Sequence, residues 1–378
     1  MLSRRRGLFG LALALVALSV GSTSQAAARP HARFHGRFLP TVERASHAGS
    51  AITPPTPPCP VGCVHAPSVL PAAGQPMPGN MVYWGGRVQV HPKLYLVYLG
   101  WGRPGAFDGD CTSVRVGFGK QTGVLKCDPN GAGRYMADFV SQLGGTEWAG
   151  VQSQYYQVVD GVKTFISNDK NQLAGIWIDD ASPTSSKLTY RMMAQEAERA
   201  AKHFKVKPAD YINSNFIIAE PKHFSDPAAP NGYCAFHDLT DPSVPDYTGI
   251  TAGLPYTNMP YVYDQGTSCG AGSVNNGAQG KLDGVTLALG HEIEETTTDP
   301  GAEFSLNGKQ FGAWYDAFDS YENGDKCAYI GAGLNGFPGA PGNITGNRGS
   351  QFAVQSLWSN NAAGGTGYCA GAGTDLGF

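Results

Sequence analysis

The stretch Leu282–Pro300, LDGVTLALGHEIEETTTDP, constrains this chain most because it joins an apolar helical pattern to a row of ionisable residues. Four apolar residues recur three or four positions apart: Leu282, Val285, Leu289 and Ile293. Residues at this spacing fall on one side of an α-helix, so the stretch predicts a helix packed on a core. Asp299-Pro300 predicts its end, because proline cannot continue a helix.

The same stretch contains the motif His-Glu-x-x-Glu. His291 and Glu295 are four residues apart, so they lie one above the other on a helix. The motif is a variant of the His-Glu-x-x-His zinc site, with a carboxylate in place of the second histidine. Acidic residues in the last turns oppose the helix macrodipole, which favours a bound cation. In this interpretation Glu292 is the general base that acts on water at the metal.

A catalytic zinc site needs a third protein ligand and one open position. The sequence offers several oxygen or nitrogen donors for it: Glu322, Asp325, Asp299 and His237. We favour the loop with Glu322 and Asp325, which a disulfide at Cys327 would anchor. The alternative is a surface helix whose charges are merely solvated.

Gly290 stands in the middle of the predicted helix. A glycine there costs about 1 kcal/mol relative to alanine. Either another backbone approaches closely or the helix bends at this point.

The N-terminus predicts secretion. Three arginines, Arg4–Arg6, precede the apolar run Gly7–Val20, and small residues suited to cleavage follow at Ala26–Ala28. Residues 1–28 are therefore predicted to be a signal peptide, and the mature protein to be extracellular or periplasmic. Residues 29–80 are rich in proline and form a linker, a propeptide or an extended segment packed on the domain. Residues 81–378 are predicted to form one globular domain without a transmembrane helix.

Eight cysteines agree with an oxidising compartment. Eight cysteines allow 105 pairings. The simplest hypothesis pairs neighbours in the chain: Cys59–Cys63, Cys111–Cys127, Cys234–Cys269 and Cys327–Cys369.

Predicted strands alternate with predicted helices, which indicates an α/β layered domain with a mixed, partly parallel sheet. The strands are expected at Val88–Trp101, Tyr155–Val159, Ala174–Ile178, Asn215–Ala219 and Gln351–Trp358, and further helices at Arg134–Gln154 and Thr189–Phe204. Two segments, Asp108–Cys127 and Pro227–Gly280, are expected to be irregular. A long loop of this kind is usually functional or held by disulfides.

Composition and motifs exclude several other functions. Charged residues make up only 15% of the chain and its net charge is −3, so nothing indicates a nucleic-acid partner. The chain has neither a G-x-S-x-G nucleophile elbow nor a phosphate-binding G-x-x-x-x-G-K-[ST] loop. A glycosidase with Asp179-Asp180 and Asp238/Asp241 as paired carboxylates is a weaker alternative, because such aspartates more commonly serve turns and helix caps.

The order of several motifs resembles a known group of proteins. The motifs are YWGGRVQVHPKLYLVYLGW, GYCAFHD, HEIEETTTDP, AWYD, ENGDKC and FAVQSLWSN. Together they resemble secreted bacterial proteins with a His-Glu-x-x-Glu motif, which are distantly similar to the plant phosphate-induced (EXORDIUM-like) proteins of the cell wall. The resemblance covers roughly residues 81–370.

The resemblance implies an extracellular location and a particular set of site residues. It pairs the helical motif with a Glu-x-x-Asp-x-Cys loop, at His291, Glu292, Glu295, Glu322, Asp325 and Cys327. The plant members carry Asn-Pro where this chain has Asp299-Pro300, which argues against Asp299 as a ligand. Gly290 departs from the group, in which serine is more usual.

We therefore expect a zincin-like domain that acts as a secreted Zn²⁺-dependent hydrolase, most simply a peptidase, on a peptide or cell-wall substrate. His291 and Glu295 would bind the metal with Glu322 or Asp325, and Glu292 would be catalytic. The alternative function is a non-catalytic extracellular or wall-associated binding protein with a structural ion site.

Overall fold

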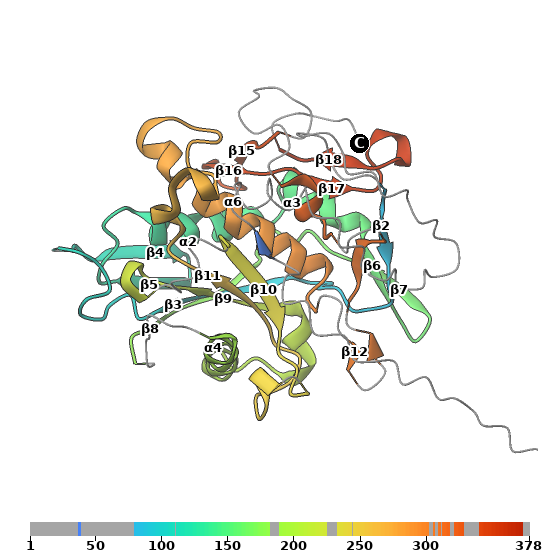
Figure 1. The fold of residues 1–378 in the computed structure, drawn as a ribbon, viewed down its shortest axis with the longest axis horizontal. Coiled ribbons are helices and arrows are strands. Elements are labelled where there is room, and N and C mark those ends of the chain that lie inside the picture. The colour runs from blue at the N-terminus through green and yellow to red at the C-terminus, as the bar shows by residue number, and fades with distance from the viewer. Residues whose placement is uncertain are drawn as a thin grey trace, which may run out of the picture. The chain divides into compact units, whose positions relative to one another are not determined.

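A six-stranded mixed sheet runs through the centre of the computed structural model (Figure 1). Its order is β1-β10-β11-β9-β3-β8. The last four strands are parallel, whereas β10 pairs antiparallel with β11, and β1 antiparallel with β10. The strands are β1 Arg37–Phe38, β3 Lys93–Leu99, β8 Leu173–Asp179, β9 Ser214–Ala219, β10 Ala235–Leu239 and β11 Pro255–Met259. The prediction of a mixed, partly parallel sheet is confirmed.

The structure describes residues 37–38, 79–109, 111–181, 189–224, 233–243, 245–301, 305–306, 309–310, 312–317, 321–328 and 340–372. All of them belong to one compact unit, Phe34–Phe378. The predicted signal peptide and the pair Cys59–Cys63 lie outside the described residues. Within the proline-rich segment 29–80, strand β1 joins the sheet edge next to β10. The division at residues 28 and 80 stays a prediction.

Helices cover both faces of the sheet (Figure 1). Helix α4, Tyr190–His203, lies on one face, and α2, Ala132–Leu143, lies with α6, Gly277–Thr298, on the other. Side chains alternate between the faces of a strand. In β3, Leu96 packs in the core of α2 and α6, whereas Val97 packs in the core of α4. The sheet is therefore apolar on both faces, as its parallel part requires.

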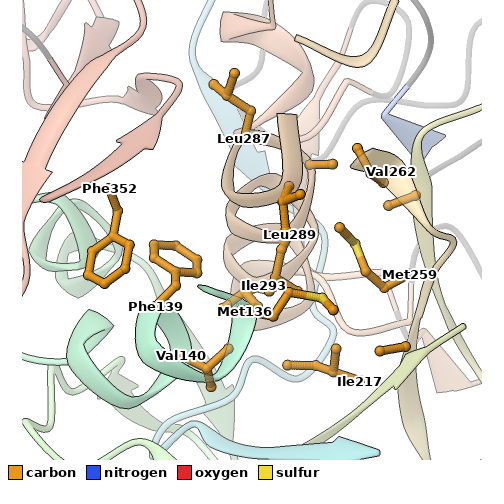
Figure 2. Close-up of a cluster of buried hydrophobic side chains, with 14 of the residues drawn as sticks. Met136, Phe139, Val140, Ile217, Met259, Val262, Leu287, Leu289, Ile293 and Phe352 are labelled. Atoms are coloured by element: carbon orange, nitrogen blue, oxygen red, sulfur yellow. The ribbon is translucent and has the colours of Figure 1, made fainter. Parts of the chain in front are cut away.

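Helix α6 is the central helix of the larger core. Every residue from Asp283 to Thr298 is buried. Figure 2 shows Leu287, Leu289 and Ile293 of α6 among side chains of α2, of the sheet and of the C-terminal strands. The sequence predicted one apolar stripe on this helix, and the structure extends burial to the whole circumference. The alternative of a solvated surface helix is therefore wrong.

Gly290 makes room for two aromatic rings. A Cβ atom at this position would lie 3.0 Å from Trp148 and 3.3 Å from Phe139. The expected close approach of another backbone is not what the structure shows, because the nearest atoms belong to side chains; the alternative, a bend, stays a prediction. Trp148 lies on α3, Glu147–Gly150, and its indole N–H donates to the carbonyl of Gln355.

Within the described residues, six two-stranded sheets lie around this framework. The pairs are β2 Met81–Tyr83 with β14 Trp314–Asp316, β4 Val114–Phe118 with β5 Gln121–Leu125, β6 Tyr156–Val159 with β7 Val162–Phe165, β12 Ser305–Leu306 with β13 Lys309–Gln310, β15 Gly342–Thr345 with β16 Gln351–Val354, and β17 Leu357–Ser359 with β18 Tyr368–Ala370. Short 3-10 helices include η1 Val151–Gln154, η2 Pro208–Asn213, η3 Lys222–Phe224, η4 Pro245–Tyr247, η5 Val262–Cys269, η6 Asp325–Cys327 and η7 Ala363–Gly365. No helix in the described part of the chain is long and apolar enough to cross a membrane.

Three of the predicted disulfides are present: Cys111–Cys127, Cys234–Cys269 and Cys327–Cys369. The second joins the start of β10 to η5, the segment before α6. The third joins η6 to β18. These two bonds hold the segments on either side of α6.

Two segments that were predicted to be irregular contain strands. Pro227–Gly280 includes β10 and β11, and Asp108–Cys127 includes the hairpin β4–β5. The sequences AFHDL and PYTNM lack the dense β-branched pattern of the other strands, although all five residues of PYTNM are buried. The sheet supplies the burial that local propensity does not indicate.

Leu289→Ala should lower the free energy of unfolding by about 3 kcal/mol, because the vacated space lies in the core between α2 and the sheet. The matched control, Leu282→Ala, changes a half-buried leucine at the start of the same helix and should cost about 1 kcal/mol. Urea unfolding of both variants would measure the difference. Equal losses would contradict the placement of α6 in the core.

Candidate metal centre

The C-terminal half of α6 supplies His291, Glu292 and Glu295, whose side chains are completely buried. The helix ends at Asp299, whose backbone N–H donates to the carbonyl of Glu295. The carboxylate of Asp299 accepts the backbone N–H of Ala313 at 2.8 Å. Asp299 is therefore the helix terminator that the sequence predicted.

Strand β10 brings His237 against this helix. Its Nδ1 atom lies 3.1 Å from Glu292 Oε2 and 3.8 Å from Glu295 Oε2. Its Nε2 atom lies 3.1 Å from the backbone oxygen of Asp299. His237 was among the candidates for the third ligand, although the loop of Glu322 was favoured. The missed strand β10 explains why its position could not be inferred.

The predicted ligand loop lies on the same cluster. Glu322 Oε1 is 3.5 Å from His237 Nε2, and Asp325 Oδ1 is 3.7 Å from His291 Nε2. The backbone N–H of Asp325 donates to Glu295 Oε1 at 2.8 Å. All five residues named for the site thus come together from two segments, while their roles as ligands or base stay predictions.

Gly324 allows the loop to approach α6. A Cβ atom there would lie 2.8 Å from His291 Nδ1 and 2.9 Å from Glu295 Oε1. Two hydrogen bonds anchor the loop. The side-chain amide of Gln355 donates to the carbonyl of Gly324, and the backbone N–H of Trp358 donates to the carbonyl of Asn323. The backbone of the loop therefore lies so close to the motif that a side chain at position 324 would overlap it.

The donor atoms fit a metal ion. Two overlapping groups, His237 with Glu295 and Glu322, and His291 with Glu292 and Glu295, each have donor atoms within 4.8 Å of one another. Ligands about 2.1 Å from a tetrahedral zinc ion lie about 3.4 Å apart. Glu295 Oε2 is 3.0 Å from His291 Nε2 and 3.8 Å from His237 Nδ1, which brackets that value. Glu295 belongs to both groups and is the common ligand of any such site.

Burial and neighbouring charges raise the pKa values of two glutamates and two histidines in the cluster. Burial raises the pKa of Glu295 to about 7 and that of Glu322 to about 8. Burial alone would lower the pKa of His291, but the carboxylate of Glu295 raises it to about 9. Burial opposes protonation of His237 in the same way, and the charge of Glu322 raises its pKa well above the usual range. The centre therefore attracts positive charge strongly.

The charges of the cluster are suited to a divalent cation. Four carboxylates, from Glu292, Glu295, Glu322 and Asp325, surround two imidazoles. With all four carboxylates ionised and both imidazoles protonated, two negative charges would be left over, which either protons on the glutamates or a divalent cation would balance. Both side-chain oxygens of Glu322 are buried and find no hydrogen-bond partner among the described residues. Such oxygens are costly to bury unless they are protonated, hydrogen-bonded or bound to a cation.

A buried polar layer behind the centre was not predicted. Lys326 is completely buried, pairs with Asp316 at 2.9 Å and lies 4.4 Å over the ring of Trp358. The Asn323 amide donates to Gln152 at 2.7 Å. The motifs AWYD and ENGDKC contain Asp316 and Lys326, but only the fold shows that they form an ion pair.

Comparison with known proteins supports one part of the resemblance noted above, the similarity to the plant EXORDIUM-like proteins. Protein EXORDIUM-like 5 of Arabidopsis thaliana is 26% identical over 220 residues, which cover 50% of this chain and 56% of the relative. The chain thus spans about half the length of this curated relative. No family model and no solved structure matches the chain. The match supports similarity to the EXORDIUM-like family and leaves the His-Glu-x-x-Glu group and a bacterial source as predictions.

Gly324→Ala should disrupt the centre and lower the free energy of unfolding by about 2 kcal/mol, because the methyl group would overlap His291 and Glu295. The backbone of Gly324 is right-handed helical, so alanine adds no backbone strain. Gly150→Ala is the matched control, because its helical backbone is similar and its new methyl would meet only Asn168, at 3.2 Å. Urea unfolding and metal titration of both variants would test this, and equal behaviour would contradict the close approach.

The metal-free protein should become less stable between pH 5 and pH 8. Glu295 and Glu322 retain protons in the folded state that the unfolded chain releases above its ordinary pKa of 4.5, so folding is favoured at the acid end. The raised pKa of His291 acts in the same direction, since its stabilisation is complete below 6.5 and is lost as the pH rises towards 9. Zinc competes with these protons, so its stabilising effect should grow with pH.

Thermal unfolding of EDTA-treated protein, with and without zinc, would measure both trends. The Glu322→Gln variant should show a weaker pH dependence in the absence of metal. A zinc-induced shift that is the same at pH 5 and pH 8 would contradict the linkage.

Proposed function

We propose that this chain is a secreted zinc-dependent hydrolase, most simply a peptidase. The observation that carries the proposal is the position of Glu292, which lies beside two donors, His291 and Glu295, in one buried cluster. His291 and Glu295 would hold the metal together with Glu322 or Asp325. The disulfides support an oxidising compartment, and a peptide or cell-wall polymer is the expected substrate.

Each residue then has a distinct role. When bound, zinc would polarise a substrate carbonyl and lower the pKa of water. Glu292 would accept a proton from the attacking water at a carboxylate oxygen. His237 would donate a hydrogen bond from Nδ1 to Glu292 Oε2 and so orient this base. Burial of the cluster would keep other water away from the transferred proton.

The zincin-like fold belongs to this proposal. Supporting it, the motif-bearing helix α6 lies on a mixed sheet beside its antiparallel strand β10. That strand supplies His237, and the parallel strands form the rest of the support.

A second candidate, a structural ion site in a binding protein, is favoured by burial. His237, His291 and Glu295 are fully buried, and Glu322 is nearly so. Only Asp325 has an appreciably exposed side chain, at 17%. A structural zinc site is closed by four protein ligands, whereas a catalytic site keeps an open position. The closed surroundings of this cluster agree with the structural role.

Glu292→Gln separates the two functions. If the centre is catalytic, the variant should retain about one zinc per chain and lose at least about 100-fold in hydrolysis, because only the base is removed. Glu295→Gln should lose the zinc itself. Elemental analysis and release of peptides from denatured casein would be measured on both.

Glu294→Gln is the matched control, because Glu294 is also buried on α6 but belongs to neither donor group. It should retain both metal and activity. Stoichiometric zinc without hydrolysis, together with a lower unfolding temperature after its removal, would favour the structural site. Absence of stoichiometric metal from the purified protein would refute both functions.

A further inference from the structure

A second site lies away from the candidate metal centre. A cavity of about 690 Å³ opens at the amino ends of β3, β8 and β9, between the hairpin β4–β5 and the turn that follows α4. Cavities of about 300–1,000 Å³ are typical of small-ligand sites. No residue of the candidate metal centre lines this cavity, so a ligand bound in the cavity would not contact that centre.

Positive charge dominates the walls. Lys93, Lys205, Lys207 and Arg348 line the cavity, and Asp210 is the only carboxylate among its lining residues. The chain as a whole has a net charge of −3, so this local excess is opposite in sign. None of the three lysines forms an ion pair within the described part of the chain. A concave surface with free ammonium groups attracts anions.

Lys205 occupies a backbone conformation that normally favours glycine. Its φ angle is +56°, directly after α4 ends. The backbone N–H of Val206 donates to the carbonyl of Ala201, which closes a helix-ending turn of the type that places glycine at this position. A lysine there costs on the order of 1 kcal/mol. Since Lys205 lines the cavity, a ligand contact would explain why this strain is kept.

The remaining walls suit a sugar more than a simple ion. The ring of Phe118 is 58% exposed and lies 4.0 Å from the guanidinium of Arg348, which is itself held by hydrogen bonds to Ser141. Three residues with amide side chains, Gln121, Asn171 and Asn213, line the same cavity. Gln121 also donates to the carbonyl of Ala174, and Asn213 accepts from the backbone N–H of His91, so each has further hydrogen-bonding capacity only at its remaining amide atoms. Amides pair with hydroxyl groups, and an exposed aromatic face packs on the apolar face of a sugar ring.

We propose that this cavity binds an acidic polysaccharide. Carboxylates of the polymer would contact the lysines, hydroxyl groups would contact the amides, and a sugar ring would pack on Phe118. The site is independent of the proposed hydrolase function, because no residue of the metal centre takes part.

Binding of sodium polygalacturonate to the full secreted chain, measured by calorimetry, tests the proposal. We expect binding that weakens with salt, and no binding of dextran, which lacks carboxylates. Polyglutamate and single-stranded DNA carry charge without this sugar chemistry and should bind at least about tenfold more weakly. No binding of polygalacturonate, or equal binding of all three anions, would overturn the assignment.

Lys205→Gly gives the most specific test, because it should weaken binding without lowering stability. It should weaken polygalacturonate binding about fivefold, as expected for loss of one charge contact, while the unfolding temperature stays equal or rises because the backbone strain is relieved. Phe118→Ala should weaken binding similarly without reducing the salt dependence. Lys120→Ala, an exposed lysine in the turn of the same hairpin but outside the cavity lining, is the matched control and should bind normally. Loss of affinity in the control alone, or unchanged affinity in both cavity variants, would refute the site.

Discussion

The burial of charge beside α6 is the constraint on which the rest of this structure depends. Two imidazoles and several carboxylates share a volume from which water is excluded. Without a cation the carboxylates repel one another, and burial together with this repulsion raises the pKa of Glu295 and of Glu322, which favours protons in place of the missing charge. Whether a cation or protons balance the charge, the surrounding elements must hold the donor side chains close together.

The fold meets this requirement from three directions. Helix α6 fixes His291 and Glu295 on successive turns, strand β10 sets His237 against them, and the loop before η6 closes over both. The helix is itself packed between the central sheet and α2, which gives the donor side chains a rigid base. Two disulfides and a buried Lys326–Asp316 pair support the flanking segments.

The sequence predicted the parts of the structure whose signal is local. The helix of Leu282–Pro300 and the strands at Ala174–Ile178 and Asn215–Ala219 have strong periodicity or dense apolar residues, and each is present. Spacing alone also placed His291 and Glu295 together. The pairing of Glu322 and Asp325 with them came from family resemblance and from a cysteine that anchors the loop.

Long-range features could not be predicted in the same way. Strand β10 is short and polar for a strand, so its place in the sheet depends on pairing with β11. Because the sequence did not reveal β10, His237 could not be preferred over the other candidate ligands. Burial around all sides of α6 was equally hidden, because residues such as Thr296 and Glu294 are polar and are covered only by distant segments.

The bond between Cys327 and Cys369 lies directly beside the loop that carries Glu322 and Asp325. This covalent link forms only under oxidising conditions. A reduced chain inside a cell lacks the tether that holds two of the carboxylates on α6. Assembly of the complete donor set is therefore coupled to oxidation of these two cysteines, and the cluster would compete for metal ions at full strength only after their bond has formed.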